Sequence, residues 1–144
     1  MIQPWRRMKT IVCDGKKFKV IKTIFESQSL VGRATRVWEV EFEKRRYILK
    51  DAWVEVSRPA PEYEILKRMK GVPLFYCGGN VVSSDGEPVS TAVLRPFYGD
   101  SKRFRIRRRT VTSTIGAHIA TFSSKRELIS VLRDIVISMS IFQS

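Results

Sequence analysis

Residues 37–50 read VWEVEFEKRRYILK, and this stretch decides the fold class. Trp38, Val40 and Phe42 alternate with glutamates, which is the period-two pattern of a strand with one buried face. A charged turn and a second apolar run, beginning at Tyr47, follow directly. The stretch therefore predicts two antiparallel strands joined by a tight connection.

An earlier segment extends this pattern toward the N-terminus. Asp14 and Gly15 form a hairpin-type dipeptide, preceded by apolar residues from Ile11 and followed by Phe18 and Val20, which alternate with lysines. We therefore expect three consecutive antiparallel strands between residues 9 and 53.

A short helix is expected after these strands. Ile65, Leu66 and Met69 are apolar at helical spacing after Glu62, and Gly71 supplies a helix stop. Two further strands are expected at residues 91–97 and 104–114, punctuated by glycine dipeptides at 78–79 and 85–86. The sum is an α+β fold, with a twisted antiparallel sheet of about five strands and one packed helix.

A final helix is predicted from residue 123 onward. Ser123 and Ser124 can cap it, and Glu127 lies in its first turn. Its apolar positions cover nearly the whole circumference, which is typical of a helix inside a larger structure. We therefore expect further chain after Ser144 or a partner chain, and self-association of the isolated protein. The apolar positions are Leu128, Ile129, Val131, Leu132, Ile135, Val136, Ile137, Met139 and Phe142.

Length and composition indicate one partial domain over residues 1–144, with 43% hydrophobic residues and a net charge of +13. Cys13 and Cys77 lack C-x-x-C spacing, so neither a disulfide framework nor a zinc site is indicated. No stretch resembles a signal peptide or a membrane span. An intracellular protein, cytoplasmic or nuclear and without a membrane segment, is the expectation.

The densest basic run extends from Lys102 to Arg109 and reads KRFRIRRR. It is compatible with a nucleic-acid interface, because Lys and Arg neutralise phosphates. The favoured interpretation is a solvated strand face with Phe104 and Ile106 turned inward.

Gly32, Lys50 and Glu62 are the candidate binding residues, together with Val37. A glycine between strands lets backbone amides approach phosphate oxygens, and a lysine at a strand end needs an acid to hold it. Each member also has an ordinary structural interpretation, as a turn glycine, a solvated lysine or a first-turn glutamate. Glu64 is the competing acid.

At these residues the chain resembles the fungal-type protein kinase family. The matching words are GRATRVWEV at 32–40, YILKDAW at 47–53, Glu62 with Ile65 and Leu66, and FSSKREL at 122–128 through LRD at 132–134. The departures from the family pattern are Ala34, where a second glycine is usual, and Met139, where a histidine is common.

The resemblance implies the N-terminal lobe of a serine/threonine protein kinase that uses ATP and phosphorylates protein hydroxyls. Residues 9–122 would form the lobe and hinge, with the hinge near 112–116, and residues 123–144 would form the first long helix of a C-terminal lobe. By the same likeness, Lys50 contacts the ATP phosphates, Glu62 holds Lys50, Gly32 belongs to the phosphate loop and Val37 covers the base.

The catalytic and metal-binding motifs of that family, H-R-D and D-F-G, are absent from the 144 residues. Asp134 does not replace them, because LRD lies mid-helix and Met139 stands where an asparagine is required. We therefore expect no general base and no Mg²⁺ ligand here, and no phosphotransfer by this chain alone. The alternatives left open are a non-catalytic interaction module and a basic nucleic-acid-binding domain.

Overall fold

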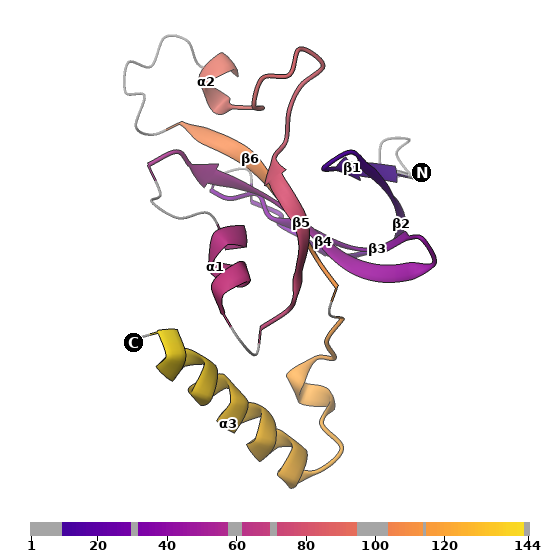
Figure 1. The fold of residues 1–144 in the computed structure, drawn as a ribbon, viewed down its shortest axis with the longest axis vertical. Helices are drawn as coiled ribbons and strands as arrows, with labels where there is room; N and C mark the ends of the chain where they lie inside the picture. Colours follow the sequence, from indigo (N-terminus) through magenta and orange to yellow (C-terminus); the bar gives the residue numbers. More distant parts are fainter. Residues whose placement is uncertain are drawn as a thin grey trace.

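The computed structural model describes residues 10–29, 32–57, 62–69, 72–94, 104–113 and 115–142. They form one curled antiparallel sheet with helices around it, which confirms the predicted α+β class (Figure 1). The strands are β1 (Thr10–Cys13), β2 (Lys16–Glu26), β3 (Arg36–Phe42), β4 (Arg45–Glu55), β5 (Phe75–Asn80) and β6 (Arg105–Thr112). The helices are α1 (Glu62–Arg68), α2 (Thr91–Leu94), the 3₁₀ turn η3 (Ile119–Thr121) and α3 (Lys125–Phe142).

The six strands follow the order β1-β2-β3-β4-β6-β5, with every neighbouring pair antiparallel. Two of the hairpins close through two-residue turns with positive φ at both positions. These residues are Asp14 and Gly15 after β1, and Glu43 and Lys44 after β3. Such turns match the right-handed twist of the flanking strands, which explains the tight connections.

The hydrophobic core lies on the inner face of the curl. Phe18, Val40, Leu49 and Val111 come from β2, β3, β4 and β6, and none of the four is exposed to solvent. Tyr76 of the edge strand β5 reaches over Phe18 with the rings edge to face at 6.3 Å. The edge strands β1 and β5 also lie against each other, so the curl nearly closes on itself.

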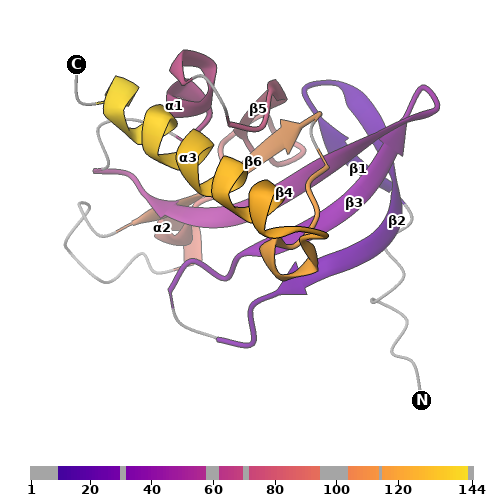
Figure 2. The same cartoon turned by 90° about the horizontal axis from the view of Figure 1, so that it is seen from below.

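Helix α3 begins as predicted, through reciprocal capping contacts. Ser124 Oγ accepts from the Glu127 backbone N–H at 3.2 Å, and the Glu127 carboxylate accepts from the Ser123 N–H at 2.7 Å. Hydrogen bonds from Ser123 hold the pKa of Glu127 below its usual value. Helix α3 lies below the sheet in Figure 1 and crosses in front of it in Figure 2, which is seen from below. Apolar side chains of this helix are widely exposed, Val136 at 65%.

The second half of the sheet differs from the prediction. Residues 91–94 form the short helix α2 instead of a strand, because Ser90 Oγ accepts from the Ala92 N–H and starts a helical turn. The remainder of that expected strand, 95–97, lies outside the described residues. Gly78 and Gly79, expected to punctuate, lie inside β5, which takes the place of the lost strand. The sixth strand comes from the first half, where four strands, β1 to β4, form and not the expected three, because the Asp14-Gly15 turn separates β1 from β2.

Gly78 explains how two glycines fit in a strand. A Cβ added at Gly78 would lie 2.6 Å from the Arg109 carbonyl oxygen of β6, whereas one added at Gly79 would meet no atom within 4 Å. The close approach of β5 to β6 therefore requires glycine at one position and merely tolerates it at the other.

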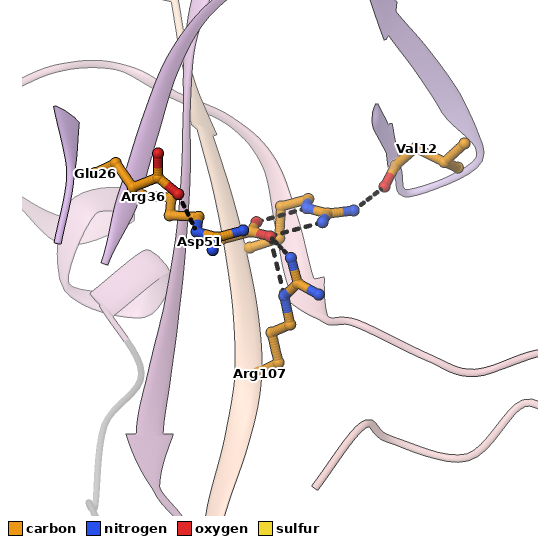
Figure 3. A network of polar contacts seen from close by, with 6 residues as sticks. Val12, Glu26, Arg36, Asp51 and Arg107 are labelled. Atoms are coloured by element: carbon orange, nitrogen blue, oxygen red, sulfur yellow. Dashed lines mark hydrogen bonds and ion pairs between the residues drawn. The ribbon is translucent and has the colours of Figure 1, made fainter. Parts of the chain in front are cut away.

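A buried carboxylate lies at one end of the core. Asp51 of β4 is 2% exposed and accepts hydrogen bonds from the guanidinium groups of Arg107 and Arg109 on β6, at 2.6 to 3.1 Å. Arg109 also donates to the Val12 carbonyl of β1, so this contact network spans the curl (Figure 3). Asp51 thus joins the middle of the sheet to its far edge.

We predict that Gly78→Ala lowers the free energy of unfolding by about 1–3 kcal/mol, because the methyl group would push β5 away from β6. Gly79→Ala is the matched control and should be neutral or stabilising by about 0.5 kcal/mol. Urea unfolding of both variants is the measurement. Equal midpoints for the two would contradict the close approach.

Asp51→Asn should lower the free energy of unfolding by about 2–4 kcal/mol, because two shielded guanidinium groups would lose their counter-charge. Asp134→Asn is the control: Asp134 is 61% exposed and pairs only with its neighbour Arg133 among the described residues, so the effect should stay within about 0.5 kcal/mol. Thermal or urea unfolding compares them. A loss of unfolding free energy as small as that of the control would mean that the Asp51 contacts do not stabilise the curled sheet.

Candidate functional site

The candidate site is built around an ion pair on the outer face of the sheet. Lys50 Nζ lies 2.7 and 2.9 Å from the two carboxylate oxygens of Glu62. Because neighbouring residues of a strand point to opposite faces, Lys50 faces away from the core that Leu49 and Asp51 enter. The two side chains are 31% and 41% exposed, so the pair is open to a ligand.

Helix α1 fixes the acid of this pair. Glu62 is the first helical residue, where the N-terminal end of the helix favours a carboxylate. The helix packs on β5 through Tyr63, whose ring lies 6.0 Å from that of Phe75. Glu64, the competing acid, pairs instead with Lys67 at 3.3 Å. Lys50 is therefore bound by Glu62 and not by Glu64.

Val37 is placed next to Lys50 by strand register. In the β3 and β4 pairing Val37 lies directly opposite Lys50, and Thr110 of β6 lies opposite Lys50 on the other side. The three residues form one row across the sheet. The lysine therefore has an apolar neighbour on one side and a hydroxyl-bearing neighbour on the other.

Gly32 lies in the connection between β2 and β3 and has a φ of +99°, which glycine adopts without strain. Its carbonyl accepts from the Arg105 guanidinium of β6, and the neighbouring Arg33 carbonyl accepts from the Trp53 N–H at 2.8 Å. Ala34 also has a positive φ, of +40°. The connection is thus tied to β4 and β6 in a backbone shape that suits glycine at two positions.

A cavity of about 240 Å³ lies between α1 and the sheet, beside the ion pair. Three cationic residues, Arg33, Lys50 and Arg108, line it, against the single carboxylate of Glu62. Arg33 Nη2 lies 3.7 Å from the same carboxylate. Arg108 Nη1 is buried and has no hydrogen-bond partner among the described residues. The lining of the cavity therefore carries a net positive charge.

The sequence analysis did not identify Arg33 or Arg108 as site residues. Arg33 could have been found as the neighbour of Gly32 in the same connection. Arg108 could not, because it reaches the cavity only through the pairing of β6 with β4. Conversely, Gly32 and Val37 were predicted site residues but do not line this cavity.

The basic run is largely used inside the fold. Arg107 and Arg109 bind Asp51, and their side chains are only 28% and 11% exposed. Arg105 pairs with Glu55 at 3.5 Å. The expected solvated face is therefore wrong for Arg107 and Arg109, because both lie on the core side of β6 and bind the buried Asp51. The expectation that Ile106 turns inward is wrong as well, since by register it shares the outer face with Arg108. These contacts also leave fewer free cations for a nucleic acid.

Other kinds of site lack support in the described part of the chain. No three His, Cys, Asp or Glu side chains gather there in a way that could hold a metal ion. Asp134 lies in the middle of α3, as predicted. None of the described helices has the length and apolar character needed to cross a bilayer.

Comparison with known proteins gives one match. The family described as Fungal protein kinase matches residues 2–96, about two thirds of the chain and a range that contains Gly32, Lys50 and Glu62. The words at 122–134 lie beyond this match. No curated protein and no solved structure matches. Because the matched range covers more than half of the sequence and its sheet has the predicted α+β form, the chain belongs to the fungal protein kinase family.

Proposed function

We propose that this chain binds the phosphate groups of ATP between Lys50 and the connection that carries Gly32, as the N-terminal lobe of a serine/threonine protein kinase does. The observation that carries the proposal is the bidentate contact of Lys50 with Glu62, since a lysine held in this way presents a fixed ammonium to a phosphate. Membership in the kinase family supports ATP as the nucleotide.

The charge of the cavity supports an anionic ligand. Arg33, Lys50 and Arg108 exceed Glu62 by two positive charges. Arg108 lines the cavity together with Lys50 and would add a further cation near a bound phosphate. Val37 lies beside Lys50 and would contact the base, while Gly32 would let the backbone approach the phosphates.

Phosphoryl transfer is not proposed for these 144 residues alone. The sequence contains neither H-R-D nor D-F-G, so the chain supplies no residue to orient a substrate hydroxyl and no metal clamp for the γ-phosphate. In the complete family such residues act on protein hydroxyls with Mg²⁺. An intracellular location remains a prediction of the sequence.

We predict that ATP binds the folded chain and that Lys50→Met weakens this affinity about tenfold or more, because one charge-assisted phosphate contact is lost. Lys19→Met is the matched control: Lys19 is an exposed lysine on β2 outside the cavity, so affinity should not change. Isothermal titration with ATP, and with adenosine to isolate the phosphate contribution, is the measurement. Circular dichroism of each variant establishes folding.

Three results would contradict the proposal. One is a folded wild-type chain that binds no ATP. Another is equal affinity of wild type and Lys50→Met, which would place the phosphates elsewhere. Adenosine that binds as tightly as ATP would likewise remove the role of the cationic cavity.

The exposed apolar surface of helix α3 indicates a second property, self-association of the isolated chain. Its apolar residues are widely exposed, including Ile129 at 66% and Val136 at 65%. Exposed apolar surface of this kind is typical of an interaction face. This property is compatible with the alternative that the chain acts as a kinase-like interaction module.

We expect the chain to migrate as an oligomer in size-exclusion chromatography with light scattering, and Val136→Glu to shift it toward monomer. Ser140→Glu is the control, because it adds the same charge one helical turn away without removing apolar surface. A monodisperse wild-type monomer would contradict the prediction.

A further inference from the structure

The two cysteines of the chain meet where the curled sheet closes on itself. Cys13 ends β1 and Cys77 lies in β5, and these strands are the opposite edges of the sheet. Their sulfurs are 3.8 Å apart, and both thiols are free. The two residues are 64 positions apart in the chain, so only the fold brings them together.

The surroundings shift the pKa values of the two thiols in opposite directions. Both residues are buried, at 5% and 4% exposed. The hydrogen bond between the two sulfurs lowers the pKa of Cys77, and nearby Lys16 also lowers it, while the same hydrogen bond raises the pKa of Cys13. At this separation a thiolate on one sulfur can accept a hydrogen bond from the other thiol.

One sulfur of the pair, that of Cys13, borders a hollow that a small reagent can enter. A hollow of about 350 Å³ opens on this side of the molecule, lined by Cys13, Gly15, Gly78, Gly79 and Arg109 among others. Cys77 is not among the residues that line this hollow, so a reagent that enters it would meet Cys13 first. The hollow is large enough for a molecule the size of a peroxide, which is only a little larger than water.

We propose that Cys13 and Cys77 form a thiol–disulfide site that is oxidised by a small peroxide and joins β1 to β5 covalently. The thiolate sulfur attacks one peroxide oxygen, an S–O bond forms as the O–O bond breaks, and the departing hydroxide takes up a proton. The second sulfur then attacks the sulfenic sulfur, the S–S bond forms, and the hydroxide that leaves takes the second thiol proton. Two thiols and one hydrogen peroxide thus give one disulfide and two waters.

A disulfide would act on the edge strand β5, which supports the proposed phosphate site. Helix α1, which carries Glu62, packs on β5 through Tyr63 and Phe75. A disulfide at Cys77 would fix β5 to β1 and close a long loop, which restricts the unfolded chain. We therefore expect the oxidised protein to be more stable than the reduced protein.

A redox titration of the full chain tests the site. The protein is equilibrated with graded ratios of reduced to oxidised glutathione, folded and in urea, then quenched, alkylated and weighed by mass spectrometry. Glutathione disulfide exchanges with the two thiols to give the protein disulfide and two reduced glutathiones, so no other oxidant is needed. Because the chain has two cysteines, an intramolecular disulfide can only be this pair.

The folded chain should become half oxidised at a glutathione ratio at least about tenfold more reducing than the urea-unfolded chain, because folding holds the sulfurs together. The oxidised form should melt on the order of 10 °C higher. Equal or reversed ratios, or an unchanged or lower melting temperature, would overturn the proposal.

Hydrogen peroxide provides the second measurement. The folded wild-type chain should lose two hydrogen atoms in mass and remain a single chain on a non-reducing gel. In Cys77→Ser, the remaining Cys13, which lines the hollow, should instead accumulate sulfenic acid that is trapped by dimedone. Wild-type protein that gives only sulfinic acid or disulfide-linked dimers would refute the site without bearing on ATP binding.

Discussion

The alternation of side chains along β4 is the constraint on which the rest of the structure depends. Successive residues point to opposite faces of a strand, so Leu49 and Asp51 enter the curl while Lys50 faces α1. A shift of one residue in register would exchange these faces and place the lysine in the core. The same strand therefore fixes the hydrophobic core, the buried carboxylate and the candidate phosphate-binding lysine.

Local patterns in the sequence predicted the parts of the fold that local physics determines. The alternation in residues 37–50 and the Asp14-Gly15 turn correspond to β3, β4 and the first hairpin. The caps of α3 lie within a few residues of each other, and so they too could be read from the sequence. Glu62 was placed at the start of α1 from its spacing to Ile65, and this is where the helix begins.

Contacts between distant segments could not be predicted in this way. Strand β5 contains Gly78 and Gly79, which locally favour a turn, and only the close approach of β6 makes a strand there. The inward direction of Arg107 depends on Asp51, which lies 56 positions earlier in the chain. Arg108, the next residue in β6, lies on the opposite face because successive residues of a strand alternate between faces. A run of arginines therefore divides between two faces that composition alone cannot distinguish.

The charged residues on the two faces of the sheet differ in how much they contribute to stability. Asp51 is buried with two guanidinium partners, and so its charge is costly to leave unpaired. Lys50 and Glu62 are partly exposed, and a pair of that kind contributes only about 0–1 kcal/mol to folding. Arg108 lies on the same face and lines the same cavity, and its Nη1 has no hydrogen-bond partner among the described residues. The charged pair of the outer face therefore contributes less to folding than Asp51 and its two arginine partners on the inner face.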